Sequence, residues 1–586
     1  MGTQSNRVQS HAGEVRADVS HGRSNFSDFF PWLRSYPDEV PASVDIDRYP
    51  NVVSILEESF QLHPDRVAYS CMGREMSYRE LESRSRDLAA YFQEIGLVPG
   101  DRLAVMLPNI LQSPVTVAAA FRAGLVVVNI NPLYTPRELK LQLNDSGAKG
   151  IVLLNTAAGR LQEVVTETDI DHVVVTQLGD MHRATTAAAI NFYVRYVKRL
   201  VPRFRLTNAI TFKRALHTGR RSTFRAPRIE PDDLAVLQYT GGTTGTPKGA
   251  MLLHRNLVAA MLSCKAWLEP VLKNFPSDDQ MTVVCALPLY HVFAFVNCSL
   301  IAACTGGQSL LIPDARDASS IIKALKGRHF HSFAGVNTLF NALVEHPEFE
   351  TLDFRELRMS VGGGMEVSPK TAQRWFEITG CPIAEGYGLT ETTSGVCCNR
   401  LDLETFTGKL GLPMPGADIQ ILDPEGRRTP LGVPGEIAVR GLSVMQGYWN
   451  QPEATRAVVT DEGFLRTGDI GTMDEHGFVK FLGREKDVII VSGFKVYPTE
   501  IESVLKEITG VIDCAAVGAP DEKSGQAIWL FVVADEVGET EIEKKCRQSL
   551  AAYKRPAQIV HVESLAVRGP GKIDRIALRQ IAAREA

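Results

Sequence analysis

The sequence predicts an α/β fold, followed by a smaller β-rich region and a small α+β unit at the C-terminal end. In the first half, short Val, Ile and Leu runs such as LAVMLPN, VVVNINP and GIVLLN end in Pro or Asn and are separated by segments with helical spacing. Buried parallel strands that alternate with helices give this pattern. After about Gly408 the chain has short strands separated by Gly, Pro, Asp and Glu, as in GEIAVRG and GFVKFLG, which is typical of a β-rich subdomain.

The same patterns assign the remaining elements in order. Helical spacing over residues 54–92 is interrupted by the short strand VAYSCMG, and beyond residue 230 the runs VVCALPLYH, SLLIP, HSFAGV and LRMSVGGG predict further strands. From about Lys486 to the end, strands in AAVGAP and AIWLFVVAD combine with helices in PTEIESVLKEI and EIEKKCRQSL. The sequence therefore predicts two α/β subdomains, a β-rich subdomain and a C-terminal α+β unit.

Composition is that of a globular protein. The 586 residues are 44% hydrophobic and 22% charged, with a net charge of −5, which excludes a fibrous or wholly disordered chain. At about 150 residues per domain, this length allows three or four folding units. Residues 1–26 are polar and lack the apolar run of a signal peptide, so a disordered tail is expected there.

Neither the apolar runs nor the cysteines indicate a membrane span or a disulfide framework. Residues 115–128 are interrupted by Arg122, and residues 292–304 by Asn297 and Ser299, so neither run is expected to span a bilayer. The ten cysteines contain no C-x-x-C pair. Reduced thiols in a cytoplasmic protein are the simplest interpretation, and contact with a membrane surface stays open.

Residues 181–229 form the clearest break in composition. They contain twelve Lys or Arg residues and no Asp or Glu, so the rest of the chain carries −17. Aromatic and apolar residues are interleaved with these cations, as in an amphipathic segment that lies on a surface. The cations are Arg183, Arg195, Lys198, Arg199, Arg203, Arg205, Lys213, Arg214, Arg220, Arg221, Arg225 and Arg228. The interleaved residues are Phe192, Tyr193, Tyr196, Val197, Leu200, Val201 and Phe204.

Three interpretations of this basic segment are open. The first is peripheral attachment to an anionic membrane, at the inner face of the cytoplasmic membrane, because each cation near such a surface contributes about 1 kcal/mol. A solvated basic face is an equal alternative. Nucleic-acid binding is less favoured, since no motif that reads nucleic acid accompanies the segment.

The stretch LQYTGGTTGTPKGAMLL, residues 237–253, has the composition of a phosphate-binding loop. Residues 240–246 contain four threonines and three glycines, and Lys248 follows directly after Pro247. Glycines let backbone N–H groups turn towards an anion, hydroxyls add donors and the lysine adds a charge. A Walker A loop would need Gly before the lysine and Ser or Thr after it, so this is a different loop. The alternative is an ordinary turn between a strand at 234–239 and a helix that begins near His254.

Further downstream, three segments carry residues of matching chemistry. In GYGLTE, Tyr387 could stack on a base, Thr390 could bond a phosphate and Glu391 could bind a hard cation through oxygen. Asp469 and Arg484, at the edge of the β-rich region, could bond the two hydroxyls of a ribose. A turn with a capping Thr and a surface ion pair are the alternatives.

A lysine close to the C-terminus, Lys572 in GPGKID, is the last candidate residue. Its charge would suit an anionic substrate, although a solvated lysine in a glycine-rich tail is the simpler alternative.

Taken in this order, these segments resemble the adenylate-forming superfamily of acyl-CoA synthetases, adenylation domains and luciferases. The resemblance covers residues 36–578. Within the superfamily the sequence is most similar to bacterial long-chain fatty-acid–CoA ligases, on RYPNVV, NPLYTPRELKLQLNDSGAK, ALPLYHVFA, GVNTLFNALV, GGGMEV and VSGFKVYPTEIE. The resemblance implies an N-terminal domain at 27–485, which includes the basic insert 181–229, and a mobile C-terminal domain at 486–586.

The resemblance also implies how ATP would be held. The β- and γ-phosphates would be wrapped by Thr240, Gly241, Gly242, Thr243, Thr244, Gly245 and Lys248. The adenine would be enclosed by Gly362, Gly363, Gly364, Glu385, Gly386 and Tyr387. Asp469 and Arg484 would hold the ribose. Thr390 would lie near the α-phosphate, and Glu391 would bind Mg²⁺.

The implied reaction has two steps. A fatty-acid carboxylate attacks the α-phosphorus of ATP and expels pyrophosphate, assisted by Mg²⁺ and Lys572. The C-terminal domain then rotates about a hinge at Lys486 and brings Gly493 to the tunnel through which the CoA thiol attacks the acyl-adenylate.

The acyl side of the site is implied by three further residues. His291 would lie where the acyl pocket meets the CoA tunnel, Phe295 would be an aromatic gate, and Val336 would line the acyl pocket. Leu339, Phe340 and the run 292–304 are candidates for the same tunnel.

Other functions remain as alternatives. The acid could be medium-chain or aryl, or the product could be an acyl-adenylate passed to a carrier protein. A membrane-binding scaffold without catalysis is a third interpretation, and a homodimer is an open assembly state. One departure concerns Lys572, whose flanks, VRG-PG before it and IDR after it, differ from the usual family pattern.

Overall fold

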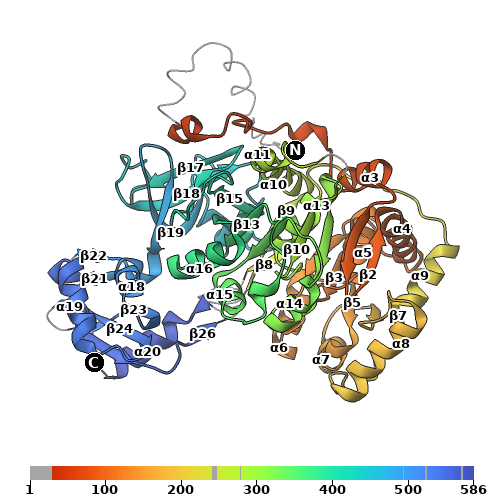
Figure 1. The fold of residues 1–586 in the computed structure, drawn as a ribbon. Coiled ribbons are helices and arrows are strands. Elements are labelled where there is room, and N and C mark those ends of the chain that lie inside the picture. Colours follow the sequence, from red (N-terminus) through yellow and green to blue (C-terminus); the bar gives the residue numbers. More distant parts are fainter. Residues whose placement is uncertain are drawn as a thin grey trace, which may run out of the picture.

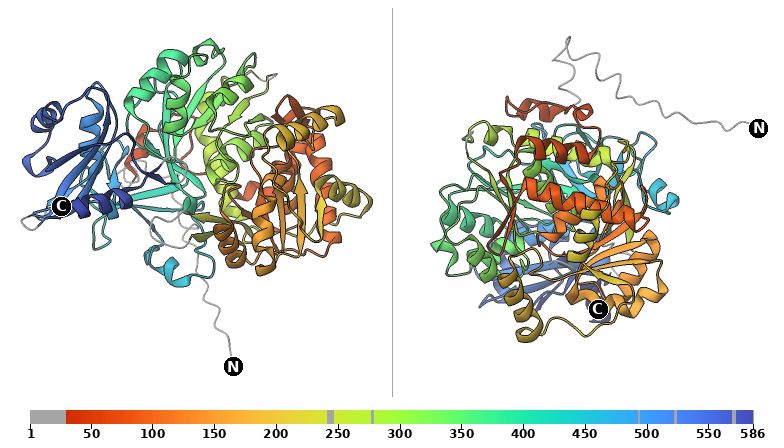
Figure 2. Two further views of the ribbon diagram at one scale, coloured as in Figure 1. Left: turned by 90° about the horizontal axis from the view of Figure 1, so that it is seen from below. Right: turned by 90° about the vertical axis from the view of Figure 1, so that its right-hand side faces the viewer.

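The computed structural model describes residues 30–240, 247–276, 279–492, 494–521, 524–568 and 572–585, without the side chains of Arg568 and Lys572. Its described strands form five sheets. Figure 1 and the left panel of Figure 2 show the two large sheets side by side, the C-terminal unit at one end and helices α8 and α9 at the opposite end. The predicted α/β fold with a β-rich part and a C-terminal α+β unit is confirmed.

The first large sheet has the strand order β7-β6-β5-β3-β4-β8-β9 and is parallel except for the hairpin β8–β9. The strands are β3 (Arg102–Met106), β4 (Val126–Asn129), β5 (Gly150–Leu154), β6 (His172–Thr176), β7 (Ala209–Thr211), β8 (Leu234–Thr240) and β9 (Lys248–Leu253). Strand β9 was not predicted, because a turn leading straight into the helix at His254 was expected. The helix α10 does begin at His254.

The second large sheet has the order β16-β15-β14-β13-β12-β10-β11-β1-β2 and is parallel from β14 to β1. The strands are β1 (Val67–Cys71), β2 (Arg74–Ser77), β10 (Thr282–Cys285), β11 (Gln308–Leu311), β12 (Ser332–Gly335), β13 (Met359–Gly363), β14 (Ile383–Leu389), β15 (Ser394–Cys398) and β16 (Leu412–Pro413). The carboxyl ends of its parallel strands carry the predicted adenine residues.

Two smaller sheets and one strand pair complete the chain. An antiparallel sheet of four strands follows residue 408, as predicted, and a five-stranded sheet lies in the C-terminal unit. The first contains β17 (Ala417–Leu422), β18 (Gly435–Gly441), β19 (Leu465–Met473) and β20 (Val479–Arg484). The second contains β21 (Ile489–Val491), β22 (Phe494–Val496), β23 (Val511–Asp521), β24 (Gly525–Ala534) and β25 (Gln558–His561), and the pair is β26 (Val567–Arg568) with β27 (Lys572–Ile573).

Helices cover both faces of the large sheets. Helix α4 packs against α5 and α9, and α6 packs against α7. The helices are α3 (Val52–Leu62), α4 (Tyr78–Glu94), α5 (Gln112–Arg122), α6 (Pro136–Ser146), α7 (Ala158–Val164), α8 (Ala184–Phe192), α9 (Phe212–Arg221), α10 (His254–Trp267), α11 (Glu269–Leu272), α12 (Val292–Ala294), α13 (Ile301–Cys304), α14 (Ala318–Leu325), α15 (Asn337–Val344), α16 (Pro369–Thr379), α17 (Pro452–Arg456), α18 (Pro498–Lys506), α19 (Glu539–Ser549) and α20 (Arg575–Glu585).

Short helical turns link these elements. Two of them are π-helical, η5 (Tyr193–Val197) and η6 (Phe295–Leu300). The others are the 3-10 turns η1 (Pro31–Ser35), η2 (Ile46–Arg48), η3 (Asn155–Ala157), η4 (Val165–Glu167), η7 (Phe349–Thr351), η8 (Thr390–Thr392), η9 (Glu485–Asp487) and η10 (Ala552–Lys554). Within the described ranges, no helix is both long and apolar enough to cross a bilayer.

The core explains why the strands are so apolar. Every residue of β5 is buried, and on β4 the side chain of Val127 joins one apolar cluster whereas Val126 and Val128 join another. Alternate residues of a strand point to opposite faces, so both faces of this sheet are covered. The larger cluster continues into the second large sheet, and the two α/β regions therefore share one core.

Candidate active site

The phosphate-binding loop predicted at 240–249 lies between β8 and β9. Thr240 and Lys248 are paired residues of this antiparallel hairpin, so the two ends of the loop are adjacent. Gly241, Gly242, Thr243, Thr244 and Gly245 lie outside the described residues. The ammonium group of Lys248 lies over the ring of Tyr448, 4.9 Å from its centroid.

Gly249 and Tyr239 fix the base of this hairpin. A Cβ atom at Gly249 would lie 3.1 Å from the Tyr239 ring, so a glycine is needed for the ring to pack there. The Tyr239 hydroxyl donates to Asp145 at 2.5 Å. This bond anchors the β8 side of the loop to helix α6.

The predicted adenine residues lie at the carboxyl ends of β13 and β14. Gly362 pairs with Glu385, and Gly363 pairs with Gly386. Ligands of α/β proteins bind at this end of parallel strands. The glycines also have a packing role, because a Cβ atom at Gly362 would come within 2.7 Å of Val367.

Gly362, Gly363 and Gly364 form a surface that is here called the glycine-lined wall. The side chain of Phe293 packs against it. A Cβ atom at Gly363 would lie 3.2 Å from the Phe293 ring, and Gly364 has a φ of +76°. Nothing in the sequence distinguished Phe293 from the other apolar residues of its run, and only the fold places it against the wall.

Glu385 is buried and points back into the protein. Its Oε1 accepts a hydrogen bond from the backbone N–H of Val367 at 2.9 Å. The pKa of Glu385 is raised to about 8, mainly by burial. The hydrogen bond from Val367 and the charge of Lys506 oppose this rise, and the charge of Glu366 adds to it. The carboxyl group therefore helps hold the loop that follows β13.

Tyr387, Asp469 and Arg484 form a continuous polar group. The hydroxyl of Tyr387 donates to Oδ2 of Asp469 at 2.8 Å, and Nε of Arg484 lies 2.8 Å from Oδ1 of the same carboxylate. Asp469 and Arg484 are register partners on β19 and β20. Burial, and then the charge of Asp469, raise the pKa of Tyr387, so the phenol stays neutral and donates. Residues predicted separately as adenine and ribose contacts thus lie together.

Thr390 and Glu391 follow β14 in the turn η8. The Oε1 atom of Glu391 accepts a hydrogen bond from the Tyr448 hydroxyl at 2.7 Å, and its backbone carbonyl accepts from the N–H of Met445 at 2.8 Å. Oε2 of Glu391 has no hydrogen-bond partner in the described part of the chain. Tyr448 was not predicted, because it lies 57 residues further along the chain.

The described residues contain no cluster of three or more His, Cys, Asp or Glu side chains that could hold a metal ion by themselves. Mg²⁺ is commonly held by one or two carboxylates together with the phosphates of a nucleotide. A single half-buried carboxylate with one open oxygen, opposite the phosphate loop, fits that mode of binding.

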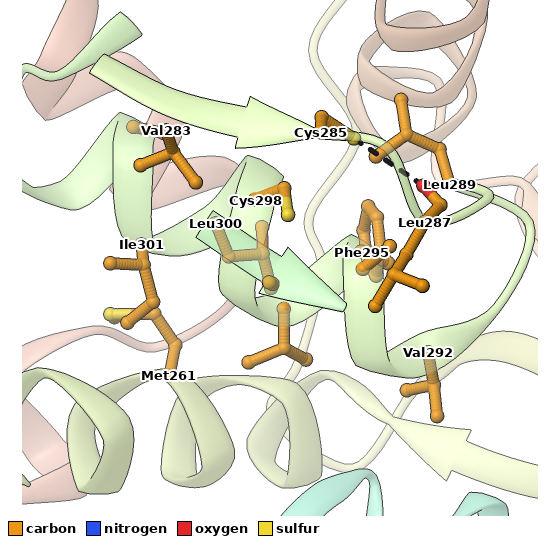
Figure 3. Packing of buried hydrophobic residues seen from close by; sticks show 14 of the residues in the cluster. Met261, Val283, Cys285, Leu287, Leu289, Val292, Phe295, Cys298, Leu300 and Ile301 are labelled. Carbon is orange, nitrogen blue, oxygen red and sulfur yellow. Dashed lines mark hydrogen bonds between the residues drawn. The ribbon is translucent and has the colours of Figure 1, made fainter. Parts of the chain in front are cut away.

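His291 precedes the short helix α12, and its ring lies 4.8 Å from that of Tyr290. The next turn of the chain is the π-helix η6, which begins at Phe295. Short π-helical stretches occur frequently at functional sites. Figure 3 shows Phe295 beside Leu287 and Leu289, within the apolar cluster.

Phe295 lines a small, mostly apolar cavity of about 20 Å³ between η6 and helices α3, α4 and α5. Its ring lies 6.1 Å from that of Phe121. One wall holds a buried hydrogen bond of 2.5 Å between the hydroxyls of Tyr69 and Ser299.

Val336 lies elsewhere. A Cβ atom at Gly364 would lie 3.8 Å from Cγ1 of Val336, so Val336 lies beside the glycine-lined wall. Phe340, also predicted for the acyl pocket, is fully buried and packs edge-on against Trp375 at 4.7 Å. The acyl residues named from the sequence thus occupy at least two separate surroundings.

The C-terminal unit contacts the predicted hinge. Arg579 on α20 donates to the carbonyl oxygen of Lys486 at 2.9 Å and to Asp487 at 2.5 Å. Arg575 forms a buried ion pair with Glu502 at 2.7 Å. Gly493 lies outside the described residues, and only the backbone of Lys572 is described, in strand β27 opposite Arg568.

The basic segment is exposed, as its pattern indicated. Phe192 and Tyr196, at the end of α8 and in η5, are 60% and 59% exposed, and their rings lie 5.0 Å apart. Arg195 lies over the Tyr196 ring and Lys198 over the Tyr193 ring. Aromatic rings and cations are therefore mixed on one surface.

Two family descriptions match the sequence. The AMP-binding enzyme description matches residues 56–449, and the AMP-binding enzyme C-terminal domain matches residues 500–572. The chain belongs to the AMP-binding enzyme family. The predicted membership of the adenylate-forming superfamily is thereby confirmed, and the matches include the phosphate loop, Glu391, Tyr448 and Lys572.

Relatives within this family resemble almost the whole chain. A protein of Yersinia pestis named long-chain-fatty-acid–CoA ligase is 47% identical over 94% of this chain and 97% of its own length. A protein of the same name from Escherichia coli O6:H1 is 46% identical, with the same coverage. The crystal structure of ATP-bound MatB from Rhodopseudomonas palustris is 28% identical, with a TM-score of 0.76 over 91% of this chain and 99% of that one.

Proposed function

We propose that this protein is a long-chain fatty-acid–CoA ligase. It uses ATP to convert a fatty acid into an acyl-adenylate and pyrophosphate, and then transfers the acyl group to CoA, releasing AMP. The observations that carry this proposal are two polar groups. Tyr387, Asp469 and Arg484 form one, and Tyr448 joins Glu391 and Lys248 in the other. Full-length similarity to proteins named long-chain-fatty-acid–CoA ligase supports the choice of acid.

In the first step two anions must meet. An oxygen of the fatty-acid carboxylate forms a bond to the α-phosphorus, and the bond between that phosphorus and the oxygen bridging to the β-phosphate breaks. Lys248 with residues 240–245 binds the departing pyrophosphate, and Thr390 and Lys572 lie at the α-phosphate. Glu391 and the phosphates would hold Mg²⁺, which would neutralise part of this charge. Placing cations where charge develops is the main source of catalysis here.

The nucleoside is held by the remaining residues. The adenine lies against the backbone of Gly362, Gly363 and Gly364 and on the Tyr387 ring, with Glu385 and Gly386 behind it. Asp469 accepts hydrogen bonds from the ribose hydroxyls, and Arg484 fixes the position of Asp469.

The second step uses the C-terminal unit in another orientation. The CoA thiol loses its proton, the sulfur bonds to the acyl carbon, and the bond to AMP breaks. We assign the domain boundary to residues 485 and 486, with Lys486 as the hinge, Gly493 in the CoA tunnel and His291 where that tunnel meets the acyl pocket. The basic insert 181–229 belongs to the N-terminal domain, 27–485. The contacts of Arg579 with Lys486 and Asp487 would tie α20 to the hinge.

The acyl chain enters the apolar region around η6. We assign Phe295, which lines the small cavity beside α3, α4 and α5, to the boundary between the nucleotide side and the acyl pocket. Val336, which lies beside Gly364, is assigned to the wall of that pocket. An aromatic side chain at such a boundary acts as a gate.

The proposal is tested by incubating the purified protein with ATP, Mg²⁺ and fatty acids of graded length. Pyrophosphate should be released only when a fatty acid is present, and thioester should form only when CoA is added. Ferulate is a further test acid, because a feruloyl-CoA synthase of Amycolatopsis is 32% identical. Pyrophosphate release with ferulate but not with fatty acids would identify an aryl acid as the substrate. Pyrophosphate without thioester would favour an acyl-adenylate ligase that serves a carrier protein.

We further propose that the protein attaches peripherally to the inner face of the cytoplasmic membrane through its basic segment. Exposed aromatic residues next to cations are typical of surfaces that bind at the level of lipid headgroups. The exposure of Phe192, Tyr193 and Tyr196 supports this assignment. It would bring the enzyme to the place where its apolar substrate is dissolved.

A further inference from the structure

Residues 445–449, here called the crossing segment, connect three sheets. The segment follows strand β18 of the four-stranded sheet after a short link. It pairs with β9 of the first large sheet, where Ala250 and Tyr448 form an antiparallel bridge. Trp449 N–H donates to the carbonyl of Gly249 at 2.8 Å, and Met251 N–H donates to Gly447 at 2.9 Å. Met445 N–H donates to the carbonyl of Glu391 at 2.8 Å, beyond the end of β14.

The crossing segment places the Tyr448 side chain between two charged groups. Its hydroxyl donates to Oε1 of Glu391 at 2.7 Å, and its ring lies 4.9 Å below the ammonium nitrogen of Lys248. Lys248 and Glu391 form no ion pair with each other in the described part of the chain. One side chain therefore contacts both charged groups.

Tyr448 suits this task because it remains neutral and rigid. Its side chain is only 7% exposed, and its backbone N–H is held by Thr455 at 2.8 Å. A phenol is neutral at physiological pH, so it donates a hydrogen bond to the carboxylate. A hydrogen bond to Oε1 fixes the rotation of the carboxylate and directs Oε2 away from Tyr448.

We propose that Tyr448 is a positioning residue that keeps the Glu391 carboxylate available to a divalent cation and the Lys248 ammonium available to phosphate. This inference rests on the proposed function, because it needs Glu391 and Lys248 to bind Mg·ATP. The residue acts through these two groups and does not itself touch the reacting atoms. Groups that orient a metal-binding carboxylate change metal affinity by about 10-fold to 100-fold when they are removed.

Two variants separate the two contacts of Tyr448. Tyr448→Phe keeps the ring below Lys248 and removes only the hydroxyl that holds Glu391. Tyr448→Leu removes both contacts. Tyr49→Phe is the matched control, because it also removes a buried phenol that donates to a carboxylate, that of Glu58, outside the candidate site.

Nucleotide binding is measured by calorimetry, once with ATP and increasing Mg²⁺ and once with ATP in EDTA. For Tyr448→Phe we expect the Mg²⁺ concentration that gives half-maximal binding to rise by about tenfold or more. Its affinity for metal-free ATP should change by less than about twofold, because the cation–ring contact of Lys248 is retained. Tyr448→Leu should weaken binding in both titrations, and Tyr49→Phe should behave as the unmodified protein.

The binding measurements can overturn the inference in several ways. An equal loss for Tyr448→Phe with and without Mg²⁺ would show that the hydroxyl only supports the fold, and no loss would show that it does not orient Glu391. If the unmodified protein bound no Mg·ATP, the proposed function and the inference would both be wrong. If the unmodified protein bound Mg·ATP and the Tyr448 variants bound it equally well, only the inference would be wrong.

Discussion

Tyr387 donates a hydrogen bond to Asp469 at 2.8 Å, and this bond connects the second large sheet to the four-stranded sheet. The two residues are 82 positions apart in the chain, and Asp469 is paired on its other side with Arg484. The bond therefore fixes the distance between the adenine side and the ribose side of the candidate site. A ligand that contacts both residues would find them already in place.

The first prediction concerns this bond. Tyr387→Phe leaves the ring for stacking but removes the donor to a buried carboxylate, and a hydrogen bond to a charged group contributes about 1.5–3 kcal/mol. We expect a lower free energy of unfolding by an amount of that order and a higher KM for ATP, measured by denaturant titration and pyrophosphate release. Tyr49→Phe, a buried phenol outside the candidate site, should leave KM unchanged. An unaltered KM in Tyr387→Phe would contradict the assignment.

Much of this arrangement was predictable from residue type. The apolar runs that became β3, β4 and β5 are buried on both faces, and such strands can be recognised without knowledge of their partners. Asp469 and Arg484 were predicted to act together because both belong to short strands of one β-rich region. Local patterns were sufficient wherever the neighbours of a residue did not need to be known.

Other features depended on contacts distant in the sequence. Strand β9 was missed because its residues, KGAMLL, do not alternate between polar and apolar, and both its neighbour β8 and the crossing segment had to be known first. Tyr448 and Phe293 resemble ordinary core aromatics until the fold places them against Glu391 and Gly363. Phe295 and Val336 were grouped by expected role, whereas the structure gives them different neighbours.

The second prediction concerns Lys572. Lys572→Ala should lower the rate of fatty-acid-dependent pyrophosphate release by about 10² or more, because a single donor to a developing charge contributes that much. Thioester formation from a preformed acyl-adenylate and CoA should continue, since the lysine serves only the first step. Lys544→Ala, on the exposed side of α19, is the matched control. Equal loss in both half-reactions would assign Lys572 a general structural role.

The third prediction concerns pH and Glu385. Its folded pKa, raised to about 8 by burial, lies above the value of about 4.3 expected in the unfolded chain. Between these values the folded state holds the proton and the unfolded state does not, so this group lowers stability progressively as pH rises from about 4.3 to 8.

Glu385→Gln keeps an oxygen that can accept from Val367 but cannot ionise. The free energy of unfolding of the unmodified protein minus that of the variant should therefore be smaller at pH 8 than at pH 5. Denaturant titrations at both pH values measure the difference. Glu377→Gln, on the exposed face of α16, should show no such change. A constant difference for Glu385→Gln would mean that the carboxyl group is already ionised at pH 5.

The fourth prediction concerns the membrane. Replacing Arg195, Lys198 and Arg199 with Gln should weaken binding to vesicles that contain anionic lipid by about 10²-fold, at about 1 kcal/mol per cation. Phe192→Ser should weaken binding as well, by removing an exposed ring. Phe376→Ser, which removes an exposed ring on α16, serves as the control. Sedimentation with vesicles that depends on neither salt nor lipid charge would refute the proposed attachment.

The fifth prediction concerns the cavity beyond Phe295. Ala118 on α5 lines this cavity, and Ala118→Met would fill part of its volume with a flexible apolar side chain. If the acyl chain extends into the cavity, kcat/KM should fall by about tenfold or more for a sixteen-carbon acid, at about 0.8 kcal/mol for each buried methylene lost. Activity with an eight-carbon acid should change little, because a short chain ends before it reaches α5. Ala551→Met, at an exposed position, controls for the substitution itself. Equal losses with both acids would place the acyl chain elsewhere, and the cavity would then be a packing defect between η6 and α5.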